Sequence, residues 1–239
     1  SEDMLRESLK HFESSLKNLI KIREIVGVAG ARVNLAVVMM LLAKNEDDFE
    51  RAVNEEIKGC NLNKCIEIFK RSGDSDGEAG AKWLMSISLL ANRRDGEAEK
   101  LIREALEIAE EGPNEYLRAI HELTLAYILM ITNPGELRRS TDVAYEIREH
   151  ILNAHNRLER LRMTSRFISS AIMSIESYLS GDEDINELLK DLDRLIFILE
   201  KKKYKGGAWV LKRVKKVIEE SGLNQETLRT TAIKLLLAL

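Results

Sequence analysis

The stretch that decides the fold runs from Lys82 to Ile108 and reads KWLMSISLLANRRDGEAEKLIREALEI. Large apolar residues recur every three or four positions in its first part and again in its second part, as they do along one face of an α-helix. The polar segment ANRRDGEA separates the two parts, and its Asn, Asp and Gly are typical of a turn. The pattern predicts two helices folded back on each other as an antiparallel hairpin.

The rest of the chain has the composition of a helical globular protein. Of its 239 residues, 44% are hydrophobic and 32% are charged, with only 2 Pro and 13 Gly to interrupt helices. Aromatic residues make up 5%, so Leu, Ile, Ala and Met supply most of the apolar area, which favours helix over sheet. We expect an all-α protein of about twelve helices in up to six antiparallel pairs. A pair every ~40 residues is the period of helical solenoids.

Composition along the chain predicts three regions. Residues 1–71 form the N-terminal helices, and SGDSDGEAG at 72–80 is predicted to be a flexible linker or hinge. Residues 81–239 form a second helical region. Within the two helical regions, glycines at 27 and 30 are predicted to separate the first two helices, and a further break is predicted at residues 153–156.

The hairpin resembles the tetratricopeptide repeat (TPR). Met85 and Ser86 match the repeat's pair of a large and a small residue, and Leu89 matches the apolar position three residues on. The second helix matches the repeat's ladder of small and large residues at Ala98, Ile102, Ala105 and Leu106. The resemblance covers about one repeat and implies a TPR-like α-solenoid of antiparallel helix pairs. The alternative is an irregular helical bundle.

The resemblance also implies a binding surface. The concave face of such solenoids usually binds other proteins, and by resemblance the groove would be lined by Trp83, Ile87 and Leu90. The sequence departs from the family at two places: Lys82 occupies the tryptophan position, and the closing proline comes late, at Pro113. The groove residues are apolar, so the basic clamp that some relatives use for a terminal carboxylate is not indicated.

A second candidate surface lies in the basic segment at residues 201–216, KKKYKGGAWVLKRVKK, which contains no acid. Residues 201–239 carry ten basic and three acidic side chains, whereas the whole chain has a net charge of −3. The eight basic residues are Lys201, Lys202, Lys203, Lys205, Lys212, Arg213, Lys215 and Lys216. Helical spacing places those at 212, 215 and 216 on one face, and Tyr204 and Trp209 lie between the lysines. Three interpretations stay open: a solvated helix face, a site for an acidic protein, or a nucleic-acid site.

Catalytic patterns in the sequence are weak. Residues 73–77, GDSDG, match the G-x-S-x-G pattern of hydrolases, but that chemistry needs a preceding strand, and none is predicted. Two segments, from Arg6 to His11 and from Arg148 to His155, fit the loose R-x4–6-H pattern of the all-helical HEPN ribonucleases. In that family the arginine and histidine of two subunits would act on the scissile phosphate.

Metal chemistry is not indicated either. Cys60 and Cys65 are the only cysteines, and we expect them to be small core residues rather than ligands. The acidic runs at 46–48 and 182–184 occur where helices are predicted to begin, and there carboxylates stabilise the helix dipole. We therefore expect no metal and no cofactor.

These observations lead us to expect a non-enzymatic scaffold that binds a protein or peptide of unidentified chemistry. The alternatives are a nucleic-acid-binding protein that uses residues 201–216 and an HEPN-like ribonuclease. Two cysteines indicate a reducing cytoplasm. The longest apolar run, 35–43, is shorter than the ~20 residues of a membrane helix, so we expect no membrane segment. A single Gln among many Glu, Lys and Arg residues is typical of thermophilic proteins. The sequence does not indicate an oligomeric state.

Overall fold

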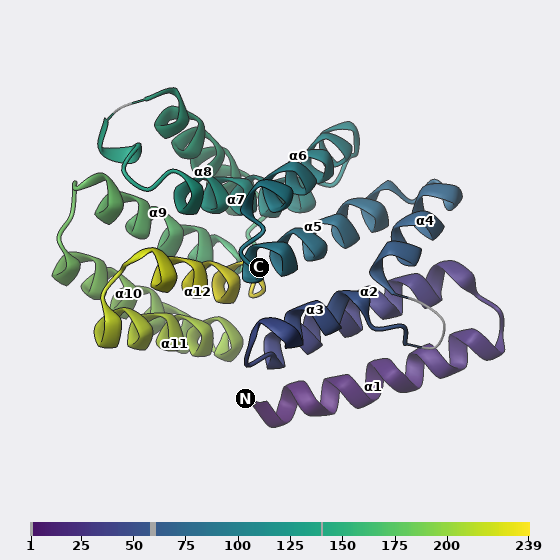
Figure 1. The fold of residues 1–239 in the computed structure, drawn as a ribbon. Coiled ribbons are helices and arrows are strands. Elements are labelled where there is room, and N and C mark those ends of the chain that lie inside the picture. The colour runs from purple at the N-terminus through teal and green to yellow at the C-terminus, as the bar shows by residue number, and fades with distance from the viewer. Residues whose placement is uncertain (1, 58–60, 140) are drawn as a thin grey trace. The chain divides into compact units, whose positions relative to one another are not determined.

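A computed structural model describes residues 2–57, 61–139 and 141–239 of the chain (Figure 1). Over these residues the chain forms twelve α-helices and one 3-10 turn, and no β-strand, which confirms the all-α prediction. The helices are α1 (Glu2–Lys21), α2 (Ile25–Leu42), α3 (Glu46–Asn54), α4 (Leu62–Ser72), α5 (Ser75–Ala91), α6 (Asp95–Glu111), α7 (Glu115–Thr132), α8 (Asp142–Arg160), α9 (Arg166–Ser180), α10 (Ile185–Lys201), α11 (Lys205–Ser221) and α12 (Gln225–Leu236), with the 3-10 turn at Leu137–Arg139.

The chain divides into two compact units, residues 1–117 and 118–239. Helix α7 begins in the first unit and continues into the second. The boundary lies well after residues 72–80, the segment for which sequence reasoning predicted a linker. That segment closes α4 and opens α5, because Gly73 ends α4 in the left-handed conformation (φ 74°) and Asp74 caps α5 through the amide of Gly77 at 2.9 Å.

Helix α2 is the hub of the first unit, where it packs against α1, α3, α4 and α5. Leu35 of α2 forms an apolar cluster with Ala31 and Leu16, and Leu9 and Phe12 of α1 pack against it. By length and composition alone, α2 is also apolar enough to cross a membrane. A core helix of a globular protein passes the same test, and the polar contacts of α2 within the unit fit that role.

Arg32 supplies those polar contacts. Its side chain is completely buried, and its Nη2 donates to the carbonyls of Ala52 at 2.8 Å and Glu55 at 3.0 Å. These carbonyls lie at the C-terminal end of α3, where the helix leaves acceptors without intrahelical partners and where a positive charge is favourable. Arg32 therefore caps α3 and fixes its position against α2.

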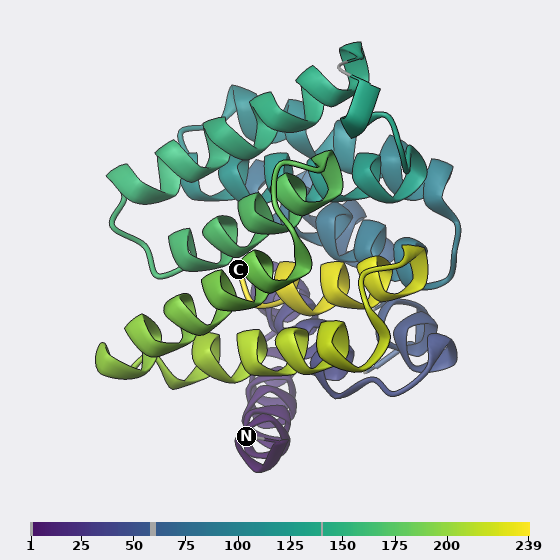
Figure 2. The same ribbon diagram turned by 90° about the vertical axis from the view of Figure 1, so that its left-hand side faces the viewer.

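The second unit is a succession of neighbouring helices. Contacts join α8 to α9, α9 to α10, α10 to α11 and α11 to α12, and α10 and α11 lie side by side (Figure 2). Helix α7 is tied to α12 by polar contacts: the Tyr127 hydroxyl lies 3.4 Å from that of Thr231, and Gln225 donates to the carbonyl of Ile131 at 3.2 Å. Burial raises the pKa of Tyr127, so its hydroxyl stays protonated in the folded unit.

Four helix joints use one turn, with a basic residue in the left-handed conformation. These residues are Arg23, Arg93, Arg162 and Lys203, with φ between 53° and 64°. In each joint the next amide donates to the carbonyl five residues back, as Arg94 does to Leu89 at 2.9 Å, which is the Schellman motif. A left-handed non-glycine residue costs roughly 1–2 kcal/mol. A cation beside the negative end of a helix offsets about 0.3–1 kcal/mol of that cost.

Two predicted helix boundaries are wrong for this reason. Gly27 and Gly30 lie inside α2, since the turn comes earlier, at Arg23, and the Glu24 carboxylate caps α2 through the amide of Gly27. Residues 153–156 lie inside α8, whose end comes at Arg160 and is followed by Arg162 in the left-handed conformation. The sequence prediction placed these two joints at Gly or Asn residues, whereas the residue in the left-handed conformation is an arginine at both.

We expect Arg32→Met to lower the free energy of unfolding of the first unit by roughly 2–4 kcal/mol, since two buried carbonyls lose a charged donor. Urea unfolding followed by Trp83 fluorescence in a Trp209→Phe background reports on the first unit only, because those are the chain's two tryptophans.

The matched control is Arg51→Met. The Arg51 side chain is 68% exposed and lies 3.8 Å from Glu55, so its removal should cost about 0.5 kcal/mol or less. Equal unfolding midpoints for the two variants would contradict the assigned role of Arg32.

Candidate functional site

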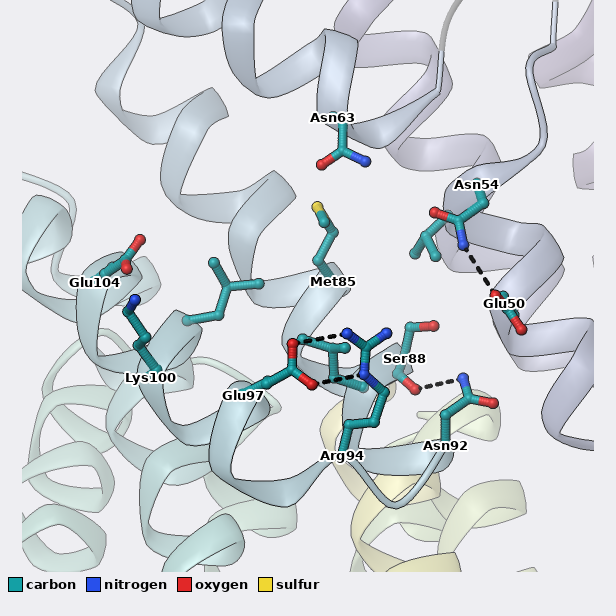
Figure 3. A pocket seen from close by; sticks show the side chains of 13 residues that line it. Glu50, Asn54, Asn63, Met85, Ser88, Asn92, Arg94, Glu97, Lys100 and Glu104 are labelled. Carbon is teal, nitrogen blue, oxygen red and sulfur yellow. Dashed lines mark hydrogen bonds and ion pairs between the residues drawn. The ribbon is translucent and has the colours of Figure 1, made fainter.

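A groove of about 660 Å³ opens on the first unit (Figure 3). Four helices and one joint line it, with α5 between α3 on one side and α6 on the other. The lining residues are Glu50, Val53 and Asn54 of α3, Asn63 of α4, Met85, Ser88, Leu89 and Asn92 from α5 and its C-cap, Arg94 of the joint, and Glu97, Lys100, Leu101 and Glu104 of α6. The volume lies within the range of sites for small molecules and short peptide segments.

Helical spacing aligns the central surface of the groove. Met85, Ser88, Leu89 and Asn92 are three or four residues apart, so they share one face of α5. Met85 and Leu89 are half-buried, as is Leu101 of α6, and together they make an apolar floor. The floor thus comes from both helices of the hairpin.

The α3 wall is held in place by two contacts with the rest of the unit. The buried Ser88 Oγ donates to the Phe49 carbonyl at 3.1 Å, which ties α3 to the floor helix. Arg32 holds the other end of α3, at the carbonyls of Ala52 and Glu55. The wall is therefore positioned by two separate polar anchors.

Most charges at the groove are neutralised locally. Arg94 forms a bidentate ion pair with Glu97. Its Nε lies 2.8 Å from Oε1 and its Nη2 lies 2.7 Å from Oε2 (Figure 3). This hydrogen bond lowers the pKa of Glu97 and raises the pKa of Arg94. Glu104 accepts from Lys82 at 3.0 Å. Lys100, by contrast, has no acidic partner in the described part of the chain.

Three side-chain amides lie around the floor. Asn63 points into the groove toward Met85 (Figure 3) and makes no hydrogen bond with any described residue. Asn54 makes one long contact, 3.5 Å to Glu50, and Asn92 donates to the Ser88 carbonyl at 2.8 Å. The groove therefore presents amide donors and acceptors beside an apolar surface.

The residues predicted to line a groove lie elsewhere. Trp83 is 8% exposed, and Ile87 and Leu90 are fully buried, so these side chains belong to the core rather than to an open surface. Met85 and Leu89, on the opposite face of α5, line the groove instead. Both faces of α5 are apolar, so hydrophobic periodicity alone does not indicate which of them is covered.

The basic segment 201–216 divides into paired and unpaired cations. Lys212 pairs with Glu200 at 2.5 Å, Lys215 with Asp193 at 2.7 Å, and Lys216 with Glu220 at 3.6 Å. Arg213 lies over the Trp209 ring at 4.8 Å. The remaining four, Lys201, Lys202, Lys203 and Lys205, are exposed and form no ion pair with a described residue.

The Arg–His pairs of the ribonuclease interpretation make contacts within the chain. Arg148 donates to Glu176 at 2.9 Å, and His155 Nδ1 lies 2.9 Å from Ser169 Oγ, so both help to join α8 to α9. On α1, Arg6 pairs with Glu2 at 2.8 Å. The ribonuclease interpretation stays a prediction.

The cysteines and the two acidic runs are the remaining candidates for metal ligands. Cys65 is buried in the core, whereas Cys60 lies outside the described residues. Asn45 caps α3, and Asp184 forms a capping box with Glu187, so both acidic runs begin helices as predicted. The described residues contain no group of three or more His, Cys, Asp or Glu side chains able to hold a metal ion.

Comparison with protein-family models, with curated proteins and with solved structures gives no significant match for this chain. A functional assignment therefore depends on the groove and on the surface charges described above.

The ion pair of Arg94 and Glu97 makes a direct prediction. We expect the Glu97 carboxyl to titrate below the usual value of 4.5, because Arg94 favours its charged form. A lowered pKa stabilises the fold at pH values above the unfolded-state pKa, and this stabilisation is lost as the pH falls through the folded-state value. NMR titration of the Glu97 side-chain carboxyl measures the shift.

In Arg94→Met the Glu97 pKa should return toward 4.5. The control is Arg51→Met, which should leave the Glu97 titration unchanged because Arg51 pairs with Glu55 instead. A Glu97 midpoint that is the same with and without Arg94 would refute the pairing.

Proposed function

We propose that this chain is a TPR-like helical-repeat protein whose groove, formed by α3 to α6, binds an extended peptide segment of a partner protein. The observation that carries the proposal is an apolar floor, made by Met85, Leu89 and Leu101, beside side-chain amides. Neither feature alone would specify a peptide, but together they match its apolar side chains and its backbone.

The repeat-like architecture is supported by the joints. The α1/α2, α5/α6 and α10/α11 pairs are each connected by three residues with the same left-handed basic residue in the middle. Each of these pairs also packs together closely. Recurrence of one hairpin geometry is what a chain of helical repeats requires.

The floor suits one or two apolar side chains of a ligand. Its three apolar residues are half-buried, so each still has area to remove from water. Covering an apolar side chain contributes about 25 cal/mol per Å². Flexible Met85 can adjust its shape to different side chains, which suits a peptide site.

The amides suit a peptide backbone. An amide side chain offers a donor and an acceptor in the same plane, as a backbone peptide group does. An extended peptide has no internal partners for its N–H and C=O groups, so it needs such partners when a groove removes water from them. Asn63 and Asn54 are exposed and available to provide them.

The uneven charge of the walls gives the ligand an orientation. Glu50 lies on α3, and Lys100 lies on α6 without an acidic partner in the described residues. A peptide with a basic side chain toward α3 and an acidic one toward α6 would complement both.

The groove favours binding over catalysis. Its single hydroxyl, that of Ser88, is buried and donates to the Phe49 carbonyl, and no histidine or cysteine lines the groove within the described residues. A serine nucleophile needs to donate its proton to an adjacent base, whereas the Ser88 hydroxyl donates to a backbone carbonyl.

A display library of random twelve-residue peptides, panned against the full chain, tests the proposal. We expect enriched peptides to carry an apolar residue with an acidic residue on one side and a basic residue on the other. Leu89→Asp should weaken the best of them roughly 10- to 100-fold, which corresponds to the ~1.5–3 kcal/mol of one buried leucine. Asn63→Ala, at an exposed position, should weaken them about fivefold through loss of one hydrogen bond.

The matched control is Leu152→Asp, at an exposed leucine of α8 in the second unit. It should bind the peptides as the wild type does, and circular dichroism should show all variants folded. Two results together would contradict the groove as the binding site. The first is equal affinity of the peptides for the wild type and Asn63→Ala. The second is a loss of affinity in Leu152→Asp as large as that in Leu89→Asp.

A further inference from the structure

A second surface begins on α10, before the basic segment 201–216, and ends within that segment. Lys190, Arg194, Phe197 and Lys201 are spaced by four, three and four residues. At 100° per residue they fall within about 60° around the helix axis, so they form one stripe about 16 Å long. All four side chains are exposed, and Phe197 is 65% exposed.

The cations of this stripe are unpaired, whereas the acids of α10 are all engaged. Glu187 takes part in the capping box, and Asp191 accepts from Ser174 at 3.0 Å. Asp193 and Glu200 pair with lysines of α11. The three stripe cations form no ion pair with any residue that the structure describes. Three of the four acids of α10 thus contact neighbouring helices, whereas its three cations are exposed to solvent.

The stripe continues into the α10/α11 joint. Lys202, Lys203 and Lys205 are exposed and unpaired among the described residues, and Tyr204 between them is 43% exposed. The joint therefore adds a second exposed aromatic ring, that of Tyr204, to the one of Phe197. Lys201 and the three lysines of the joint lie near it in the sequence. We call the stripe and the joint, residues 190, 194, 197 and 201–205, the α10 ridge.

We propose that the α10 ridge binds single-stranded nucleic acid, with its cations on the phosphates and Phe197 and Tyr204 stacked on bases. This site lies in the second unit and is independent of the peptide groove. A row of cations alone would suit any polyanion. Exposed rings between the cations add a surface on which an unpaired base can stack, which a duplex does not offer.

Two other partners fit less well. An anionic membrane would bind the apolar face of an amphipathic helix, but Leu188, Leu192 and Ile196 of α10 are buried inside the protein. An acidic protein would complement the cations but gives no reason for a 65% exposed phenylalanine at the centre of the stripe.

Fluorescence anisotropy with a labelled twenty-nucleotide oligo-dT, compared with a twenty-base-pair duplex, tests the proposal on the full chain. We expect tighter binding of the single strand. The affinity for it should fall about fiftyfold from 50 to 200 mM salt if four phosphates are neutralised, since the slope is about −0.7 per contact.

Variants separate the two parts of the ridge. Phe197→Ala should weaken oligo-dT binding roughly fivefold or more with little change in the salt slope. Lys190→Gln combined with Arg194→Gln should flatten the slope by about 1.4. The control, Lys10→Gln with Lys17→Gln on α1, removes the same charge from exposed lysines of the first unit and should leave the slope unchanged.

Several results would overturn the proposal. These are the absence of oligo-dT binding at 50 mM salt, duplex binding as tight as that of the single strand, or an equal effect of the α1 control. Binding to vesicles of one part phosphatidylserine to three parts phosphatidylcholine that is lost in Phe197→Ala, without oligo-dT binding, would assign the ridge to a membrane instead. Leu89→Asp should bind oligo-dT normally, so failure of the peptide proposal would leave this one standing.

Discussion

The first unit depends on one buried cation. Arg32 is the only charged residue of α2 and is fully buried, and leaving its charge without partners there would be costly. The chain satisfies it with the carbonyls of Ala52 and Glu55, which are themselves short of partners at the end of α3. The hydrogen bonds therefore offset two costs at once, that of burying the Arg32 charge and that of leaving the two carbonyls without a donor. This exchange requires α3 to lie against α2, and the position of α3 in turn sets one wall of the groove.

The groove is thus a consequence of how α3 is held. Ser88 reaches the Phe49 carbonyl from the floor helix, so both anchors of α3 are hydrogen bonds to its backbone. Backbone anchors leave the side chains of α3 available, and Glu50 and Asn54 face the groove as a result. The wall could therefore change its recognition chemistry by substitution without losing its support.

Local patterns in the sequence were enough to predict most of the helices but not to predict which helix faces form the exposed surfaces. The α5/α6 hairpin and the caps at Asn45 and Asp184 were predictable, because they depend on residues a few positions apart. The groove face was not, since its α3 wall depends on a contact between residues twenty positions apart, Arg32 and Ala52. The joints at Arg23 and Arg162 were missed because arginine rather than glycine adopts the left-handed conformation there.

Charge pairing explains why the basic segment was only partly informative. Spacing correctly placed Lys212 and Lys215 on one face of α11, yet their partners, Glu200 and Asp193, come from α10. Those ion pairs use up the acids on one side of α10 and leave the cations around Phe197 without acids to neutralise them. The same contacts that join α10 to α11 therefore engage two acids of α10, and the α10 ridge joins part of the basic run, residues 201–205, to three residues of α10 that lie before it.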